Sequence, residues 1–432
     1  MLPFALRIVP LWLWTLYFGC NPPESYPTID INWAPASADL CGLDPAPMAA
    51  LLGEWDDASP GRELAVVDLD GDGFAEVAYS VHAEDDYLTS GVRIHRGGPG
   101  GPEATPWVDA WGVASESLGS RLQPLADTDG DGRADLAVSI STLGTDTEGD
   151  QTITEVWSVV GTANPVPTGF VVDGGATLAG LDANGDGTGD LAVGDDGVVR
   201  LYLGGPGGLD PIPAATTENA ANRFARDHLI GLGDTDGDGH GELLVADGSS
   251  RLYLVPGGGL DGPEVEIANV GYLVSLAGGD FDGDGLADWV AGWEPGGNGK
   301  VGWWPGGTSD AAPTREWTGA NGDQRSFAGV VGDVNGDGDD ELLIGARATT
   351  VGGAEYAGEV AVHPGDSVGP MENAAFTLMA TGSRCFFGEQ LEAGDVDGDG
   401  IPDLAARVSG DNEIAVGGDA VVVLKGDASW FE

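Results

Sequence analysis

A nine-residue acidic loop recurs seven times along this chain, and it constrains the fold more than any other feature. Each copy has aspartate at position 1, aspartate or asparagine at 3, aspartate at 5, glycine at 4 and 6, and an acid at 9. The copies begin at Asp68, Asp127, Asp182, Asp234, Asp280, Asp333 and Asp395, so successive starts lie 46 to 62 residues apart. Such a period predicts a repeat architecture in which neighbouring units bury a shared core.

The composition of the loops predicts calcium binding. Carboxylates at alternate positions of a tight turn converge on one centre and repel one another unless a cation lies there. Ca²⁺ takes roughly six to eight oxygen ligands, and glycine at position 6 permits the positive φ of the turn. We expect up to seven Ca²⁺ ions, two of them more weakly held because Asn184 and Asn335 each replace an acid. The predicted ligands are Asp68, Asp70, Asp72, Glu76, Asp127, Asp129, Asp131, Asp135, Asp182, Asn184, Asp186, Asp190, Asp234, Asp236, Asp238, Glu242, Asp280, Asp282, Asp284, Asp288, Asp333, Asn335, Asp337, Glu341, Asp395, Asp397, Asp399 and Asp403.

The EF-hand is the obvious alternative, because its loop begins in the same way. An EF-hand requires a glutamate at position 12 and a helix on each side. Position 12 is never acidic here; the residues are Tyr79, Val138, Val193, Val245, Ala291, Ile344 and Ala406. The short apolar runs after each loop are typical of buried strands. EF-hand and dockerin interpretations are therefore excluded.

Each repeat is predicted to contain four strands. In the sixth copy, for example, an apolar stretch leads into the loop, a second strand follows it, a third ends at Pro364, and Phe376–Met379 forms the fourth. Four strands per unit is the content of a propeller blade. We predict an all-β fold, a seven-bladed β-propeller of four-stranded antiparallel blades with a calcium loop between strands 1 and 2 of each blade. The propeller spans residues 46–432, and an N-terminal strand at 50–55 joins the last blade and closes the ring.

The repeats resemble FG-GAP (VCBS-type) repeats, the calcium-loop blades of the integrin alpha-subunit β-propeller. The resemblance rests on Phe327–Gly329, the loop from Asp333, Ile344–Ala346 and Gly358–Val360 in the sixth copy, and on Phe387-Gly388 in the seventh. In the second and third copies only the loops match. The resemblance covers about residues 48–427 and implies that ligands bind the face opposite the calcium loops.

The N-terminus predicts export. Residues 1–19 are typical of a signal peptide, and Cys20 suggests a lipidated cysteine followed by a tether at 20–45, although bulky Tyr17 is unusual before such a site. We expect a bacterial cell-envelope or outer-membrane lipoprotein, with simple secretion as the alternative. In an oxidising compartment Cys41 and Cys385 invite a disulfide that would pin the closure; two independent thiols are the other possibility.

The charge of the chain limits its partners. The formal net charge is −54, from 71 acids and 17 bases, so nucleic acid is excluded and membrane contact is expected through a lipid anchor only. Five basic residues nevertheless precede loops by six or eight positions: Arg62, Arg121, Arg226, His228 and Arg325. We predict a cationic rim that binds a protein or glycan ligand. The alternative is that each base pairs with a neighbouring acid such as Glu63 or Asp227.

No catalytic constellation is evident. The chain lacks a Gly-x-Ser-x-Gly elbow, a His-Glu-x-x-His motif and a cysteine–histidine arrangement. We therefore expect no catalytic residues and no enzyme, but a cell-surface binding or adhesion module stabilised by calcium. The alternative is a propeller-type enzyme that acts on polysaccharide as a lyase or hydrolase.

Overall fold

The computed structural model describes residues 41–43, 47–52, 58–83, 90–113, 116–142, 151–159, 164–219, 224–258, 265–295, 297–308, 312–319, 324–408 and 420–427. All of them belong to one compact unit, Pro35–Glu432. The predicted signal peptide, Cys20 and most of the predicted tether lie outside the described residues. Within the described ranges there is no α-helix, and so none with the length and apolarity to cross a membrane.

The described strands form five four-stranded sheets and one eight-stranded sheet. Three of the four-stranded sheets follow one another in the middle of the chain, and each is a simple antiparallel meander. Their strands are β10 (Thr177–Leu181), β11 (Asp190–Asp195), β12 (Val198–Tyr202), β13 (Ala215–Glu218); β14 (Leu229–Gly231), β15 (Leu243–Ala246), β16 (Arg251–Val255), β17 (Val265–Asn269); and β18 (Leu273–Gly279), β19 (Asp288–Trp293), β20 (Lys300–Trp304), β21 (Arg315–Thr318). A fourth meander contains β22 (Arg325–Gly332), β23 (Glu341–Ala346), β24 (Glu359–His363) and β25 (Phe376–Met379). The prediction of an all-β chain built from four-stranded antiparallel sheets is confirmed.

The eight-stranded sheet consists of two meanders joined by one parallel pair, Ser90 with Ser117. The first contains β2 (Ala58–Val67), β3 (Glu76–Ala83), β4 (Ser90–His95) and β5 (Val108–Trp111). The second contains β6 (Glu116–Leu125), β7 (Asp135–Thr142), β8 (Gln151–Ser158) and β9 (Val166–Asp173).

The last sheet joins the two ends of the described chain. Its order is β1 (Ala49–Leu52), β28 (Ala420–Leu424), β27 (Asp403–Val408), β26 (Leu391–Gly394), and β1 is antiparallel to β28 with Ala49 opposite Val423. Residues 50–52 of the expected N-terminal strand lie in β1, and the rest of that expected strand, 53–55, lies outside the described residues. Cys41 forms a disulfide with Cys385 at a Cα–Cα distance of 5.8 Å, and the carbonyl of Cys41 accepts hydrogen bonds from the N–H groups of Thr381 and Gly382 at 2.8 and 2.7 Å.

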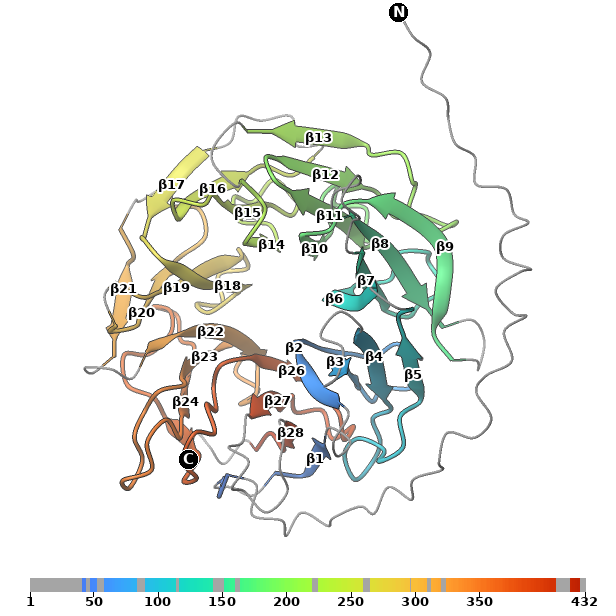
Figure 1. The fold of residues 1–432 in the computed structure, drawn as a ribbon. Coiled ribbons are helices and arrows are strands. Elements are labelled where there is room, and N and C mark those ends of the chain that lie inside the picture. Colours follow the sequence, from blue (N-terminus) through green and yellow to red (C-terminus); the bar gives the residue numbers. More distant parts are fainter. Residues whose placement is uncertain are drawn as a thin grey trace, which may run out of the picture. The chain divides into compact units, whose positions relative to one another are not determined.

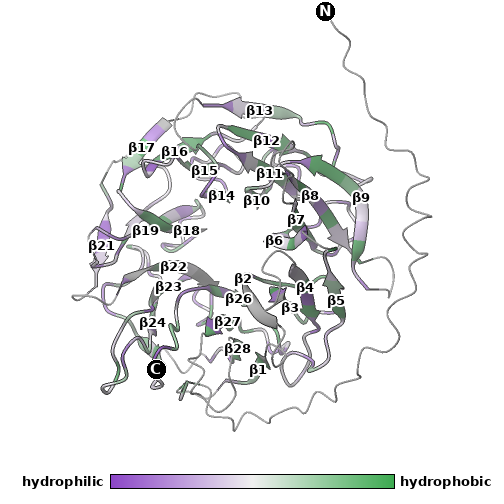
Figure 2. Cartoon of the chain, viewed as in Figure 1, coloured by the Kyte–Doolittle hydropathy of each residue, from purple (hydrophilic) through white to green (hydrophobic). Residues whose placement is uncertain are grey.

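The first strands of the meanders surround a common axis (Figure 1). Strand β2 contacts β6, and contacts continue through β10, β14, β18, β22 and β26 back to β2. The second and third strands are sandwiched between neighbouring sheets, so β19 and β23 are buried along their whole length. Burial on both faces explains why their sequences are nearly continuous apolar runs. The outermost strands, such as β13 and β21, mix hydrophilic and hydrophobic residues (Figure 2) because one face meets water.

Candidate functional site

Every acidic loop joins the first strand of a meander to the second. The loop at 68–76, for example, links β2 to β3, and the loop at 395–403 links β26 to β27. Positions 4 and 6 are left-handed in all seven copies, with φ of 73° at Gly71 and 90° at Gly73 in the first. A side chain at either position is strained, so the glycine spacing is a requirement of the turn.

The carboxylates at positions 1 and 5 are held by the backbone of their own loop. The position 1 aspartate accepts a hydrogen bond from the position 6 N–H in every copy, at 2.7 to 3.0 Å. The position 5 aspartate accepts one from the position 7 N–H, at 2.8 to 3.1 Å. These bonds fix the carboxylates before any ion arrives, which lowers the cost of ordering a metal site.

The acid at position 9 is buried and anchors the loop to its sheet. In every copy one of its oxygens accepts a hydrogen bond from the position 2 N–H, at 2.6 to 3.1 Å. The other oxygen often accepts an N–H from the turn after the third strand, as Asp190 does from Gly204 and Asp403 from Gly426, both at 2.8 Å. Burial raises the pKa of Glu76 to about 8 and that of Asp288 to about 7. A cation beside these groups favours their ionised form.

Five loops bring three carboxylates together so that their oxygens lie within 4.8 Å of one another. These groups are Asp68, Asp70 and Glu76; Asp127, Asp129 and Asp131; Asp234, Asp236 and Glu242; Asp280, Asp282 and Asp288; and Asp395, Asp397 and Asp399. The remaining two loops carry asparagine at position 3, and its amide donates to a carboxylate of the same loop: Asn184 to Asp186 at 3.0 Å and Asn335 to Glu341 at 2.9 Å.

The donor set fits a hard divalent cation. The clustered ligands are all carboxylate oxygens, which calcium prefers. Within the described ranges, Asp70 Oδ1 and Asp280 Oδ1 are buried and have no hydrogen-bond partner. A buried carboxylate oxygen without a donor is costly, and an ion at the loop centre satisfies it.

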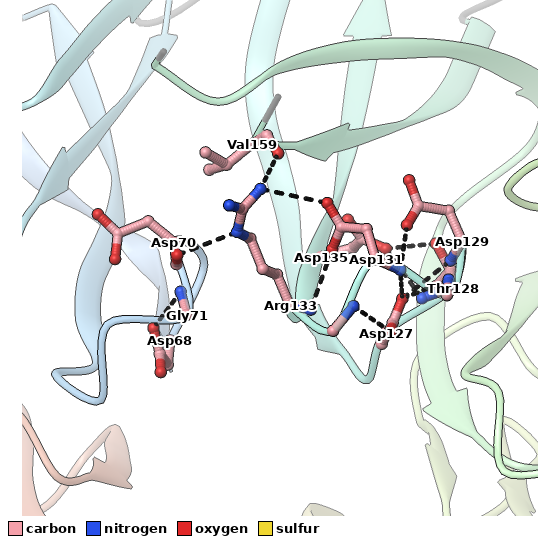
Figure 3. Close-up of polar contacts among 12 residues, drawn as sticks. Asp68, Asp70, Gly71, Asp127, Thr128, Asp129, Asp131, Arg133, Asp135 and Val159 are labelled. Atoms are coloured by element: carbon pink, nitrogen blue, oxygen red, sulfur yellow. Dashed lines mark hydrogen bonds and ion pairs between the residues drawn. The ribbon is translucent and has the colours of Figure 1, made fainter. Parts of the chain in front are cut away.

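Arg133 connects the first two loops (Figure 3). It occupies position 7 of its own loop and lies 3.3 Å from Asp131, while its Nε donates to the carbonyl of Asp70 at 3.0 Å. Its Nη1 also donates to the carbonyl of Val159 at 3.0 Å. The guanidinium therefore fixes neighbouring loops relative to each other and offsets part of their negative charge.

A cavity of about 340 Å³ lies between the first strands, and all seven of the meanders contribute to its lining. We call it the axial cavity. Its titratable residues are Glu63, Arg121, Asp227, His228 and Glu392. Amides, hydroxyls and apolar side chains complete the wall, namely Gln123, Thr177, Ser275, Gln390, Leu64, Leu122, Leu178, Leu229, Ile230, Leu276, Phe327 and Leu391.

The charges of the axial cavity are only partly balanced. Arg121 Nη1 lies 2.7 Å from Glu63 Oε1, and Arg121 Nε donates to the carbonyl of Ala176 at 2.9 Å. Burial raises the pKa of Glu63, against the opposing effect of Arg121. Burial, with the charge of Glu63, raises the pKa of Glu392 to about 8. Burial lowers the pKa of His228, which favours the neutral imidazole at pH 7.

The residues of the predicted basic rim do not form one surface in the structure. Arg121 and His228 line the axial cavity, whereas Arg226 Nε lies 4.0 Å from Asp227 Oδ1. Arg62 and Arg325 belong to β2 and β22, but their side chains lie outside the described part. At Arg121 and Arg226 the structure has the pairing with acids that the sequence left open as an alternative. Sequence reasoning missed Glu392, whose only signal is its place on the strand that precedes a loop.

Comparisons with known proteins agree with this architecture. The model of the FG-GAP repeat matches residues 327–363 and 387–424. Among solved structures, BBS1N in complex with ARL6DN is 12% identical with a TM-score of 0.50, over 83% of this chain and 90% of that one. The WD40 domain of Toxoplasma gondii coronin is 10% identical with a TM-score of 0.49, over 87% and 88%. A Bacillus licheniformis rhamnogalacturonan lyase is 12% identical with a TM-score of 0.46, over 88% and 74%.

One expectation is corrected by these comparisons. The absence of familiar catalytic motifs led to the prediction that the chain is not an enzyme. Rhamnogalacturonan lyases are among the structures with a similar arrangement of strands, so that prediction does not stand. The likeness itself concerns the fold. The chain therefore contains FG-GAP repeats at residues 327–363 and 387–424, where the acidic loops join strands 1 and 2 of four-stranded antiparallel sheets.

Proposed function

We propose that this chain is an exported, calcium-stabilised, seven-bladed β-propeller that binds a glycan in its axial cavity. The blade count follows from dividing the eight-stranded sheet at the parallel pair between Ser90 and Ser117, which gives seven four-stranded groups with the other five sheets. Pairing of β1 with β28 then closes the last blade. The propeller domain extends over residues 46–432.

Calcium is proposed as the ion of the acidic loops. Its role is structural, because each loop connects two strands of one blade and lies against the turn that follows the third. At a free calcium concentration about ten times the dissociation constant, each filled site adds about 1.4 kcal/mol to the free energy of unfolding. Melting of the soluble protein in chelator and across a calcium titration tests this role: a rising melting temperature supports it, and an unchanged one refutes it.

The observation that carries the binding proposal is that every blade contributes to one cavity with both donors and acceptors. Glu392, Gln123 and Gln390 can accept or donate to sugar hydroxyls, while Phe327 and the leucines offer an apolar surface to a sugar ring. Ligand sites commonly combine an apolar wall with a few polar groups in this way. A volume of about 340 Å³ accommodates a small ligand or the end of a chain.

Location is proposed from the sequence. We infer a signal peptide at 1–19, lipidation at Cys20 and a tether at 20–45, which would display the propeller as an adhesion module on a bacterial envelope. The disulfide between Cys41 and Cys385 supports an oxidising compartment. Labelling with a radioactive fatty acid distinguishes the lipoprotein from a secreted form, because Cys20→Ser abolishes the label only in the first case.

Binding can be tested with a panel of neutral, acidic and amino-containing oligosaccharides. Glu392→Gln and Arg121→Met are expected to weaken capture of the bound glycan at least tenfold. Glu316→Gln is the matched control, because Glu316 lies on outer strand β21 and pairs with Lys300. Equal capture by all four proteins, the wild type included, refutes the axial cavity as the binding site.

A second candidate function is elimination on an acidic polysaccharide. The observation that favours it is the presence of Arg121 and the neutral imidazole of His228 in the same cavity. An arginine can neutralise a uronate carboxylate while a neutral base removes the adjacent proton, and the glycosidic oxygen leaves as the double bond forms. Release of unsaturated sugars that His228→Ala abolishes distinguishes this activity from binding alone.

A further inference from the structure

One position in each blade lies beside the calcium loop but is not part of it. It is the residue directly after the third strand, ahead of the turn whose N–H groups reach the position 9 acid in several blades. In five blades it is apolar, and in the first and last it is basic. In chain order the residues are Arg96, Val159, Leu203, Pro256, Pro305, Pro364 and Lys425.

Lys425 pairs with two acids of the last loop. Its Nζ bonds the carboxylates of Asp397 and Asp399, the latter at 2.7 Å. These are positions 3 and 5 of the loop, and their oxygens lie within 4.8 Å of those of Asp395. The side chain of Asp397 is 6% exposed, whereas those of Asp399 and Lys425 are 34% and 49% exposed, so the ammonium joins one shielded and one partly exposed carboxylate.

Arg96 follows the third strand of the first blade, as Lys425 does in the last blade, but it makes different contacts. Its Nη2 lies 3.2 Å from Asp70 Oδ2, and its guanidinium stacks 4.1 Å above the ring of Trp107. Within the described ranges, the other oxygen, Asp70 Oδ1, is buried and without a hydrogen-bond partner. Arg96 thus pairs with one ligand position of its loop and leaves the second oxygen of Asp70 without a donor among the described residues, whereas Lys425 bridges two ligand positions.

We propose that Lys425 fills the loop at 395–403 with its own ammonium group, so that this loop binds no calcium when the others are saturated. The inference rests on the proposed calcium sites of the remaining loops. An ammonium between two carboxylates supplies the charge compensation that the ion supplies elsewhere. A divalent ion must displace it or bind against its repulsion.

The test is the number of calcium ions per chain at saturation, counted by native mass spectrometry and by equilibrium dialysis. Lys425→Met is expected to bind one ion more than the wild type. Lys300→Met is the matched control, because Lys300 is the only other lysine of the chain and pairs with Glu316 at 2.6 Å, away from the loops. It is expected to bind the same number as the wild type.

A second pair of variants guards against an effect on folding. Asp397→Asn is expected to leave the ion count of the wild type unchanged, whereas Asp236→Asn, at position 3 of the fourth loop, is expected to remove one ion or weaken it at least tenfold. An unchanged count in Lys425→Met, or a lost ion in Asp397→Asn, overturns the inference while the calcium proposal stands. If none of the proteins binds calcium, both are overturned.

Discussion

The disulfide between Cys41 and Cys385 should make a large contribution to the stability of the ring. It joins residues 344 apart in sequence, so it restricts the unfolded chain strongly. For a loop of this length the chain-entropy relation gives an upper value of about 6 kcal/mol, and the usual measured loss on removing a native disulfide is about 2–5 kcal/mol. We expect Cys385→Ser to lower the free energy of unfolding by an amount in that measured range.

Urea unfolding in saturating calcium measures this effect. Adding reductant to the wild type should reproduce the loss seen in Cys385→Ser, and reductant should change neither Cys385→Ser nor Cys41→Ser further. The two serine variants are the control, because they show whether the reductant acts on the protein in any way other than by breaking the disulfide. A loss below about 1 kcal/mol refutes the reasoning, because an entropic restriction over 344 residues cannot be that small unless the unfolded ring stays compact.

Three further perturbations test other parts of the structure. Leu51, 5% exposed in β1, packs where the ring closes, and Leu51→Ala should lower the free energy of unfolding by about 2–5 kcal/mol; a loss below about 0.5 kcal/mol contradicts closure by β1. Trp304 is 1% exposed and stacks 4.0 Å from Trp289, so Trp304→Ala should cost about 3–5 kcal/mol in the same assay. The pKa of Glu392 is raised from 4.5 to about 8 in the folded protein, so its contribution to stability is complete below pH 4.5 and is lost as the pH rises through 8. Glu392→Gln should therefore gain about 1–3 kcal/mol over the wild type at pH 8 and nothing at pH 4; a pH-independent difference contradicts this origin.

The acidic loops were predictable because most of their geometry is local. Asp68 is held by the N–H of Gly73, five residues away, and Asp72 by the N–H of Phe74. Alternating acids and paired glycines therefore encode the turn without help from the rest of the chain. The role of the position 9 acid was harder to predict from the sequence, because one of its hydrogen bonds comes from a distant residue. Asp403 accepts this bond from the N–H of Gly426, which lies 23 residues further along the chain.

The axial cavity was beyond sequence reasoning for a physical reason. Its residues lie on the first strands or directly before them, and the pairing of those strands shifts register, between Pro60 and Leu64 in β2 and between Leu118 and Arg121 in β6. A shift in register changes which residues face the axis. A fixed offset from the loop therefore predicted Arg121 and His228 as a basic rim, with pairing to acids such as Glu63 as the alternative, but gave no indication of Glu392.

The closing blade is held by three features that do not require an ion: the disulfide, the pairing of β1 with β28, and the ion pairs of Lys425 with Asp397 and Asp399 of the last loop. Chelation of calcium should therefore loosen the other loops more than this one. The amides of Gly239 and Gly400 allow a matched comparison, because each donates at 2.8 Å to the position 1 aspartate of its own loop. Hydrogen exchange at Gly239 should accelerate about tenfold or more in chelator, and at Gly400 by less than about threefold. Equal acceleration at the two amides would show that calcium also stabilises the last loop. The closing blade would then depend on calcium in the same way as the other blades.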